Sequence, residues 1–460
     1  MDTLPRRIAV LGMGASGLAV ARYLLDHRDR GHELVLSVYD AGVSALLGDS
    51  AALLGARGAC VHLGADRVDP ADLCIASPGI PPSSLLRRSA AENCARIISE
   101  IEFAYARSSS PWLAITGTNG KTTVTSLVAH VLGAGAVPAE CVGNIGDPAI
   151  EVVDSAGPST AIVAEVSSFQ LALTERFHPR VSVLLNITPD HIDWHGSLEA
   201  YASDKARVFR NQGVGDTAII CVDDAGAAPY AESVAAQGVR VVRVSRETLH
   251  PGGAGMLKGV LTLDTPSGPV QLLSASELRI KGGHNVTNAL AAAAAAAAWG
   301  VAPATITRAL ADFEPIAHRL QPVGVVGEVE YVNDSKATNP GAVLVALKAF
   351  PDRGVILLLG GRNKGSSFDE VAQRAAKTCR LVVAFGEARE EIAAACSEAQ
   401  VDYVVACSLK EAVDRAQASA HPGDVVLLSP GCASFDEFEG YAHRGRVFGE
   451  LVNPVAGVNE

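Results

Sequence analysis

The sequence predicts an α/β protein of three domains, each built on a sheet of mainly parallel strands. Length points to several domains, because 460 residues exceed what one hydrophobic core normally serves. Composition agrees: 48% of the residues are apolar, 19% are charged and 44 are glycines, which excludes a disordered chain and supplies many tight turns. Short apolar strands followed by a polar or glycine-rich loop and a helix recur along the chain, and this alternation is typical of parallel sheets.

The first strand-loop-helix unit opens a predicted Rossmann-like domain at residues 1–99. A strand from Arg7 to Leu11 leads into Gly12-x-Gly14-x-x-Gly17, and a helix then runs to about His27. In such a loop the glycines let the backbone approach a diphosphate, and the helix N-terminus attracts its negative charge.

Asp40 ends the next predicted strand, 34–39, about where an acidic side chain commonly binds a ribose. Three interpretations stay open: a nicotinamide or flavin dinucleotide, a uridine diphosphate sugar, or glycines that only allow close packing of helix and strand. Further strands are expected at 73–76 and 97–98.

A glycine-hinged lysine loop opens the predicted central domain, residues 100–315. It follows a strand at 111–115, precedes a helix through Leu132, and reads Gly117-Thr118-Asn119-Gly120-Lys121-Thr122-Thr123. Loop N–H groups and Lys121 would grip the phosphates of a nucleoside triphosphate, and the Thr122 hydroxyl would bind Mg²⁺. The loop is a shortened P-loop type, because position 115 is isoleucine; a turn without a ligand is the alternative.

Polar residues follow two later strands of this domain. Glu165 ends the strand at 161–164, and His191 follows the strand at 181–185. Because parallel strands end at one edge of a sheet, both side chains are candidate ligands of Mg²⁺. Taken alone, His191 and His195 fit polar loop residues, and Lys205 fits an exposed charge on a helix.

The rest of the central domain is expected to hold a small β insertion and a buried helix. Short strands with glycine-rich turns fill 215–278, and a helix is predicted from Val286 to Trp299. Its run of alanines is short and indicates close interior packing, not a membrane span.

The third domain, residues 316–460, is predicted to be Rossmann-like, with strands at 329–332, 355–359, 381–385, 403–405 and 425–428. Polar clusters follow three of these strands, at 333–340, 359–365 and 429–436, and could line one crevice. Asp334 could accept a proton or orient an amine, while Lys336 and Thr338 could hold a carboxylate or phosphate. Turns with helix caps are the alternative for each cluster.

Charge and cysteine content exclude several classes of protein. The formal charge of 38 − 50 = −12 argues against binding to nucleic acid or to an anionic membrane surface. Nine cysteines without a Cys-x-x-Cys pair indicate neither a disulfide framework nor a structural zinc site. With no signal-peptide pattern after Met1, a cytoplasmic location is expected.

Together the motifs resemble the Mur ligases, over essentially the whole chain. The lysine loop is shared across that superfamily, including the folate polyglutamyl ligases, so it indicates the class and not the substrate. Three stretches, 165–171, 333–339 and 429–436, look like the member that adds glutamate to UDP-N-acetylmuramoyl-L-alanine. No Asp-Asn-Pro-Arg motif, typical of the diaminopimelate- or lysine-adding member, occurs.

The resemblance implies an ATP-dependent ligase. ATP would phosphorylate the muramoyl-alanine carboxylate, and the amine of D-glutamate would attack the acyl phosphate to form an amide and release phosphate. It also implies two Mg²⁺ ions, a monomer and a carbamylated lysine at Lys205. The chain differs from the family pattern at Ala41-Gly42, where threonine and arginine contact the uridine diphosphate, and at Tyr441, where phenylalanine is usual.

By motif, the resemblance assigns residues to four sites. Those implied to bind ATP are Gly117, Thr118, Asn119, Gly120, Lys121, Thr122, Thr123, Asn285, Asn288, Arg319, Asp334 and Lys336. Those implied to bind the UDP-sugar are Gly14, Ala15, Ser16, Asp40, Asn144, Ser167 and His191. Those implied to bind glutamate are Thr338, Lys364, Ser434, Phe435 and Tyr441, and those implied to hold metal are Thr122, Glu165, His191 and Lys205. Lys121, Glu165, His191 and Lys205 form the implied catalytic set.

Two other functions stay open at this point. A folate-type or other amino-acid ligase would share the lysine loop, and a dinucleotide oxidoreductase would share the first glycine loop.

Overall fold

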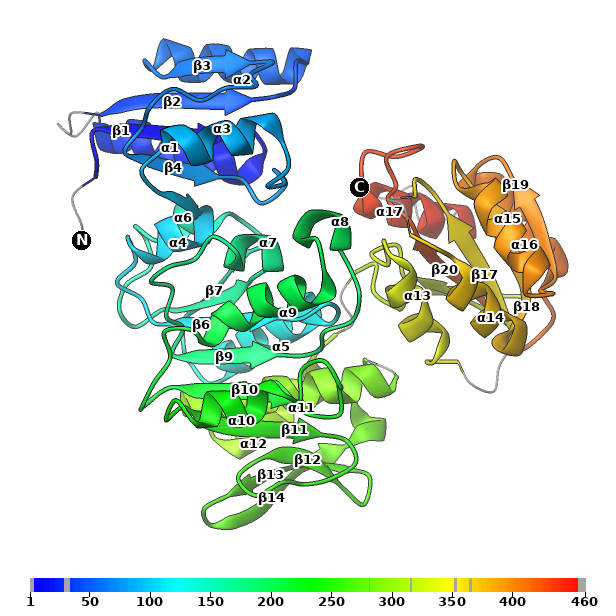
Figure 1. Cartoon of the computed structure of the whole chain (residues 1–460). Helices are drawn as coiled ribbons and strands as arrows, with labels where there is room; N and C mark the ends of the chain where they lie inside the picture. The colour runs from blue at the N-terminus through cyan, green and yellow to red at the C-terminus, as the bar shows by residue number, and fades with distance from the viewer. Residues whose placement is uncertain are drawn as a thin grey trace. The chain divides into compact units, whose positions relative to one another are not determined.

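In the computed structural model, the chain folds into α/β units with parallel-rich sheets, as predicted (Figure 1). The structure describes residues 4–28, 34–280, 282–314, 317–350, 354–363 and 366–453, with the backbone only at 45 and 46. The described strands form three sheets, and the chain divides into two compact units. The first unit runs through Glu277 and includes Thr287–Asp312, and the second comprises Leu278–Val286 and the chain from Phe313 onward.

The N-terminal sheet has five parallel strands in the order β3-β2-β1-β4-β5. Its strands are β1 (Arg7–Leu11), β2 (Val35–Asp40), β3 (Cys60–Leu63), β4 (Leu73–Ala76) and β5 (Ile97–Ser99), and its helices are α1 (Ala15–Arg28), α2 (Ala45–Ala56) and α3 (Leu85–Asn93). The strand order reverses between β1 and β4, and open α/β sheets bind ligands at such a point. β3 was not predicted, because Cys60–Leu63 is too short and too exposed to show an apolar run.

The central sheet has nine strands in the order β14-β13-β12-β11-β10-β9-β6-β8-β7. Its strands are β6 (Trp112–Thr116), β7 (Ala139–Gly143), β8 (Ala161–Glu165), β9 (Val181–Leu184), β10 (Thr217–Cys221), β11 (Arg240–Ser245), β12 (Ala254–Leu257), β13 (Val260–Thr265) and β14 (Gly268–Ser274). The helices of this part are α4 (Glu100–Tyr105), α5 (Lys121–Ala134), α6 (Ala149–Val152), α7 (Ser168–Leu171), α8 (Ile192–His195), α9 (Leu198–Ala206), α10 (Tyr230–Ala235), α11 (Gly283–Trp299) and α12 (Pro303–Asp312), with short 3₁₀ turns at Arg207–Phe209 and Ala275–Glu277.

The predicted β insertion is continuous with this sheet. β10 and β11 pair in parallel with their neighbours and extend the central sheet, and only β12, β13 and β14 form an antiparallel meander at its edge. The alanine-rich α11 is an interior helix, as expected, since Ala289–Ala296 are almost completely buried. Within the described residues, no helix is long and apolar enough to cross a bilayer.

The second unit contains a six-stranded sheet in the order β15-β16-β20-β17-β18-β19. Its elements are β15 (Gln321–Val326), β16 (Val329–Asn333), β17 (Val355–Gly360), β18 (Cys379–Phe385), β19 (Tyr403–Ala406), β20 (Val425–Gly431), α13 (Pro340–Leu347), α14 (Asp369–Thr378), α15 (Arg389–Glu398), α16 (Leu409–Ser419) and α17 (Tyr441–Val452). β15 is antiparallel to β16 and was not predicted, and the remaining pairs are parallel.

One hydrophobic core continues from the N-terminal sheet into the central sheet. Tyr23 of α1 lies edge-on against Phe103 of α4, with 5.9 Å between ring centroids, and both belong to a cluster that includes Trp112 of β6. The division at residue 99 into two domains therefore stays a prediction. The predicted boundary at 315/316 falls outside the described residues.

Candidate active site

The lysine loop joins β6 to α5, and its glycines take conformations that other residues avoid. Gly120 has a φ of +86° and Gly117 a φ of +153°. A Cβ on Gly120 would meet Asn288 Oδ1 at 2.6 Å, so both packing and strain exclude a side chain there. Gly120 caps α5 without a side chain, which leaves the positive end of this helix facing the loop.

Neighbouring side chains hold the loop in place. Thr118 Oγ1 lies 3.0 Å from the hydroxyl of Tyr201 on α9, and the Asn119 N–H donates to Asn186 Oδ1 at 2.8 Å. Thr122 and Thr123, in the first turn of α5, are buried. The loop is therefore preorganised by the segment after β9 and by α9.

Two lysine amines gather at one carbonyl of this loop. Lys121 Nζ donates to Gly117 O and to Thr118 O, at 2.9 Å in each case. Lys205 Nζ, carried by α9, donates to the same Gly117 O at 2.8 Å. Both amines therefore lie at the loop where a polyphosphate was predicted to bind.

Lys205 is only 2% exposed, which contradicts the alternative of a solvated helical charge. Its Nζ lies 4.5 Å from the centroid of the Tyr201 ring. Burial lowers the pKa of Lys205 well below its ordinary value, and Lys121 lowers it further, while Asp190 and Glu165 oppose the change. Burial therefore favours the neutral amine of Lys205.

Glu165, the last residue of β8, has one hydrogen-bonded oxygen and one without a partner. Oε1 accepts from Asn144 Nδ2 at 2.8 Å. Oε2 is buried and, in the part of the chain that the structure describes, has no hydrogen-bond partner. Because an unpaired buried carboxylate oxygen is unfavourable, this atom is suited to a cation.

His191 begins α8 with a left-handed backbone, φ +53°. Its Nε2 lies 3.6 Å from Asp190 Oδ2, and its ring packs edge-on against Phe169 at a centroid distance of 4.7 Å. Phe169 follows Glu165 by four residues, so this contact joins the loop after β9 to the segment after β8.

The four predicted metal ligands come from α5, the end of β8, the start of α8 and α9, of which α5 contacts β8 and α8 contacts α9. Among the described residues, no group of three or more His, Cys, Asp or Glu side chains lies close enough to hold a metal. The predicted set contains only two such residues, Glu165 and His191, and needs Thr122 and a modified Lys205 to complete it.

The glycines of the first loop have different roles. A Cβ on Gly17 would run into the Gly12 carbonyl oxygen, so Gly17 permits the close approach of α1 to β1. Gly12 has a φ of +87° and lies against Ser77 after β4. Gly14, by contrast, has no atom within 4 Å of an added Cβ, and it is exposed together with Ala15, the first residue of α1, while Ser16 is half-buried. The open space at the switch point of this sheet therefore lies over Gly14.

The Asp40 side chain fixes this loop by accepting hydrogen bonds from backbone N–H groups. Its Oδ2 accepts from Met13 N at 2.7 Å, and its Oδ1 accepts from Gly42 N at 2.8 Å. The sequence pattern predicted a ribose contact for Asp40 and gave no sign of this structural role. A contact with a ligand stays a prediction.

Ser167 caps the short helix α7. Its hydroxyl accepts from Gln170 N at 3.3 Å, and Gln170 Oε1 accepts from Ser167 N at 2.9 Å, a reciprocal capping box. Asn144 lies after β7 and contacts Glu165 as described. The structure brings Asn144 to the Glu165 carboxylate. Ser167 forms hydrogen bonds with Gln170, within its own turn.

Asn285 and Asn288 lie in the first two turns of α11 and are both buried. Asn288 Oδ1 is the atom nearest to Gly120, which places this residue at the lysine loop.

In the second unit, Asp334 is buried directly after β16. Its Oδ2 accepts from the Ser429 hydroxyl at 2.8 Å, and its Oδ1 accepts from Leu320 N at 3.3 Å. Burial raises the pKa of Asp334 to about 7, against the opposing effects of Ser429 and Arg319. Asp334 therefore joins the segment after β16 to the end of β20 and to the residues before β15.

Lys336 and Tyr441 contact each other. Lys336 Nζ lies 3.9 Å from the centroid of the Tyr441 ring, at the start of α17.

The other residues predicted to bind glutamate lie in the loops after β16 and β20. Thr338 is half-buried, Ser434 is buried and Phe435 is 64% exposed. Lys364 lies outside the described residues.

Arg444 of α17 was missed by the sequence analysis. It is completely buried, and its guanidinium donates to Ser335 Oγ at 2.9 Å, Ser335 O at 2.9 Å and Cys432 O at 3.1 Å. Burial lowers the pKa of Arg444 from 12.5 to about 10. An arginine in a helix gives no signal of burial in the sequence, because one of its partners, Ser335, lies 109 residues away and another, Cys432, lies in a different loop.

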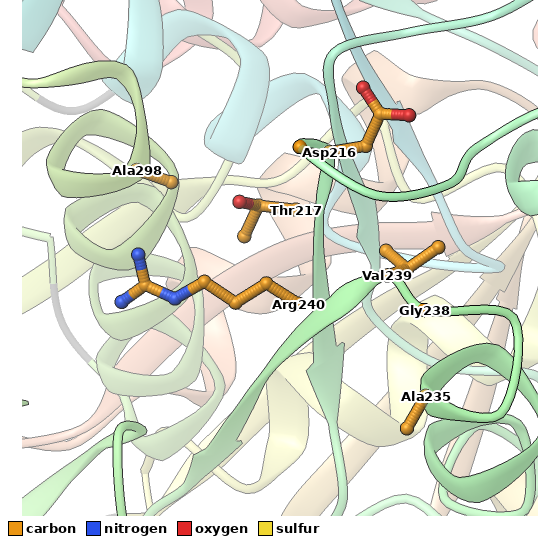
Figure 2. Close-up of a pocket in the computed structure, with 8 residues that line it drawn as sticks. Asp216, Thr217, Ala235, Gly238, Val239, Arg240 and Ala298 are labelled. Atoms are coloured by element: carbon orange, nitrogen blue, oxygen red, sulfur yellow. The ribbon is translucent and has the colours of Figure 1, made fainter.

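A separate shallow pocket of about 380 Å³ lies at the opposite ends of β10 and β11, and Figure 2 shows Arg240 and Thr217 among its lining residues. None of the predicted site residues lines it. Since these strands begin there, the pocket is not at the edge where the loops after the strands gather.

Two family models match the chain. The Mur ligase middle domain matches residues 115–296, and the glutamate ligase domain of the Mur ligases matches residues 318–432. The chain is 40% identical over 457 residues to the UDP-N-acetylmuramoylalanine--D-glutamate ligase of Pelotomaculum thermopropionicum, covering 98% of each chain. It is 42% identical over 459 residues to the protein of the same name from Salinibacter ruber, covering 97% of each.

Solved structures share the fold. A pseudomurein peptide ligase type C from Methanothermus fervidus superposes with a TM-score of 0.62 at 19% identity, covering 97% of this chain and all of that one. A UDP-N-acetylmuramate-alanine ligase from Thermotoga maritima gives a TM-score of 0.59 at 19% identity, covering 97% and 99%. At these identities the likeness concerns the fold alone.

Proposed function

The chain belongs to the Mur ligase family, and from this premise we propose that it joins D-glutamate to UDP-N-acetylmuramoyl-L-alanine. It is an ATP-dependent ligase of peptidoglycan precursor synthesis. The choice of substrates is supported by relatives at 40% and 42% identity that carry that activity in their names and align over nearly the whole chain.

The observation that carries the proposal is the Lys121 amine at Gly117 O, next to the N-terminus of α5. Both features favour the polyphosphate of ATP, bound by residues 117–123. With ATP bound, phosphate oxygens would replace the Gly117 and Thr118 carbonyls as hydrogen-bond acceptors of Lys121. The Lys121 amine could then stay bonded to the phosphoryl group during its transfer. Asn288, which packs on Gly120, would border the same nucleotide. Asn285 is proposed for the nucleotide by its motif alone.

The reaction has two steps. A carboxylate oxygen of UDP-N-acetylmuramoyl-L-alanine attacks the γ-phosphorus of ATP, and ADP leaves, giving an acyl phosphate. The free amine of D-glutamate then attacks the acyl carbon, phosphate leaves with the bonding electrons, and the nitrogen loses a proton as the amide forms. Lys121 and the α5 N-terminus stabilise the negative charge on the phosphoryl oxygens during the first step.

Mg²⁺ fits the residues present. Glu165 Oε2 is a buried oxygen without a partner in the described residues, and oxygen ligands of this kind are what Mg²⁺ prefers. Glu165, Thr122, His191 and a carbamylated Lys205 would hold one or two ions. When bound, Mg²⁺ would neutralise charge on the phosphate oxygens.

The environment of Lys205 supports its carbamylation. Only a neutral amine has the lone pair needed to add to CO₂, and burial lowers the pKa of Lys205. Addition of the neutral amine to the carbon of CO₂ and loss of one proton would turn it into a carboxylate-like anion. The carbamate of Lys205 would carry two oxygens that can bind Mg²⁺ next to Lys121, whereas the unmodified amine has no oxygen.

The UDP-sugar is proposed to lie over Gly14, Ala15 and Ser16, where the loop is open, with Asp40 fixing that loop. Asn144, Ser167 and His191 are proposed to contact its muramoyl end, since Asn144 donates to Glu165, Ser167 lies two residues after Glu165 and His191 packs against Phe169.

In the second unit, Arg319, Asp334 and Lys336 are proposed for the nucleotide. Thr338, Lys364, Ser434, Phe435 and Tyr441 are proposed for D-glutamate. The Lys336 amine already lies on the Tyr441 ring, so the two proposed sites share a border. We further propose that the protein acts as a monomer in the cytoplasm, without nucleic-acid or membrane partners.

The test is phosphate release from ATP in the presence of Mg²⁺ and different acceptors. Release is expected only when UDP-N-acetylmuramoyl-L-alanine and D-glutamate are both present, with L-glutamate much less effective. Hydroxylamine added without glutamate should yield the hydroxamate of the muramoyl-alanine carboxyl group, which reports the acyl phosphate. Release with a folate and L-glutamate in place of these substrates would overturn the substrate assignment.

A further inference from the structure

A largely buried hydrogen-bond chain of Ser168, His195 and Asp204 lies beside the proposed active site, with 17% of the Asp204 side chain exposed. His195 Nδ1 lies 2.9 Å from Asp204 Oδ2, and His195 Nε2 lies 2.9 Å from Ser168 Oγ. The His195 side chain is fully buried and Ser168 is 2% exposed. The sequence analysis took His195 for a polar loop residue, and the structure contradicts that interpretation.

The direction of the hydrogen bonds follows from the chemistry of the groups. Asp204 can only accept, so the proton of the neutral ring lies on Nδ1, and Nε2 accepts the Ser168 hydroxyl proton. The second carboxylate oxygen, Asp204 Oδ1, accepts from Arg207 Nε at 3.0 Å. The imidazole also stacks on the Phe169 ring at an interplanar angle of 11°. Each polar atom of the chain thus has a partner, and the ring has one orientation.

The three members sit next to three residues of the proposed metal site. Ser168 follows Glu165 by three residues, and Asp204 directly precedes Lys205. His195 lies one helical turn after His191, and its backbone N–H donates to the His191 carbonyl at 3.1 Å. One chain of hydrogen bonds therefore ties together the segments after β8 and β9 and the helix α9.

The arrangement of a serine, a histidine and an acid is not a nucleophilic site here. A serine nucleophile has to reach its substrate, and Ser168 lies buried in the first turn of α7 under the histidine ring. The chain can therefore act on catalysis only through the residues that it positions.

We infer that the Ser168–His195–Asp204 chain is a positioning device that sets the placement of Glu165, His191 and Lys205 relative to one another. The inference rests on the proposed function, because those three residues are metal ligands only under that proposal. Residues that orient ligands typically change metal affinity or activity by about 10- to 100-fold when they are removed.

The experiment compares wild type with Ser168→Ala and Asp204→Ala. Both variants are expected to lower kcat by about 10- to 100-fold and to raise the Mg²⁺ concentration for half-maximal activity. The KM for D-glutamate is expected to stay near the wild-type value. The double variant should lose less than the product of the single effects, because either substitution already breaks the chain.

A second readout does not depend on turnover. Mn²⁺ binding in the presence of ADP, followed by titration calorimetry, should weaken in both variants. Asp204→Asn keeps an oxygen that accepts from His195 Nδ1, so it should recover most of the Mn²⁺ affinity lost in Asp204→Ala. It also remains informative if Asp204→Ala fails to fold.

Ser197→Ala is the matched control. Ser197 caps α9 by accepting from Ala200 N at 3.1 Å, so its loss weakens the same helix and leaves the chain intact. It should lower the unfolding midpoint and leave kcat and Mn²⁺ affinity unchanged. If Ser168→Ala and Asp204→Ala behave like Ser197→Ala, the positioning role is overturned while the proposed function stands. If wild type neither binds Mn²⁺ with ADP nor turns over ATP, the proposed function fails as well.

Discussion

At the scale of single residues, the lysine loop owes its character to two amines that compete for one carbonyl. Lys121 and Lys205 both donate to Gly117 O, and the charge of Lys121 lowers the pKa of Lys205. Burial lowers the pKa of Lys205 more, so the positive charge of this residue is suppressed, whereas Lys121 is only half-buried. Their roles differ although the residue type is the same.

Replacing Lys121 by alanine should lower kcat/KM by roughly 10²- to 10³-fold, the usual effect of removing one group that stabilises transition-state charge. The fold should persist, because the substitution also relieves repulsion with Lys205. Phosphate release and far-UV circular dichroism check both points. Lys377→Ala, at an exposed position on α14, is the matched control and should behave as wild type. Near-normal turnover in Lys121→Ala would remove the loop from the mechanism.

Asp334 makes stability depend on pH. Burial raises its pKa from 3.8 to about 7, so between these values the native carboxyl holds a proton that the unfolded chain has lost. The stabilisation is complete below about pH 4, falls as the pH rises, and is fully lost above about pH 7.

Asp334→Asn cannot ionise and should escape this loss. Relative to wild type, its free energy of unfolding should rise by on the order of 2 kcal/mol between about pH 5 and about pH 8. Denaturant unfolding of the second unit at the two pH values measures the difference. Parallel pH curves for both proteins would show that the carboxyl does not titrate in this window.

At the scale of elements, the turn from β1 to α1 contains glycines of two kinds. Gly12 and Gly17 are needed for close packing, and Gly14 borders open space. Gly17 lets α1 lie against the Gly12 carbonyl, whereas no atom of the described residues lies within 4 Å of a Cβ added at Gly14. The three glycines of the fingerprint look equivalent in the sequence, and only the packing distinguishes them.

Gly17→Ala should therefore destabilise the protein by about 1–3 kcal/mol, since the added methyl group collides with backbone. Gly14→Ala should leave the unfolding midpoint unchanged and raise the KM for the UDP-sugar about tenfold, equivalent to roughly 1.4 kcal/mol of binding. Thermal unfolding and steady-state kinetics on both variants test the contrast. Equal kinetics in Gly14→Ala and wild type would place the sugar nucleotide elsewhere.

At the scale of the whole molecule, the structure divides into two compact units, whereas the sequence predicts three domains. The three tryptophans, Trp112, Trp194 and Trp299, all belong to the first unit. Tryptophan fluorescence therefore reports the unfolding of that unit, while circular dichroism reports both.

Leu357→Ala, in the core of β17, should cost the second unit about 2–5 kcal/mol. We expect it to lower the midpoint of one circular-dichroism transition and leave the fluorescence midpoint unchanged. ADP with Mg²⁺ should raise the fluorescence midpoint, because a ligand stabilises the unit that binds it. Coincident midpoints for the two probes in every variant would mean that the units unfold together.

Much of this architecture was predictable because its signals are local. The strands β1, β4, β8 and β16 are apolar runs followed by glycine or polar residues, and each was predicted within one residue, while the end of β20 was missed by three residues. β3 and β15 were missed, because half-exposed edge strands show no apolar run. The continuity of β10 and β11 with the central sheet was also missed, since strand pairing between distant segments leaves no pattern in either segment.

The sequence by itself determined the fold class, the family and the lysine loop, because turn geometry and phosphate binding both depend on residues adjacent in the chain. Only the tertiary structure decided that Lys205 is buried, that Glu165 Oε2 has no hydrogen-bond partner among the described residues, and that Ser168, His195 and Asp204 form one chain. Burial and hydrogen-bond partners depend on which distant segments pack together, and no local spacing of residues encodes that.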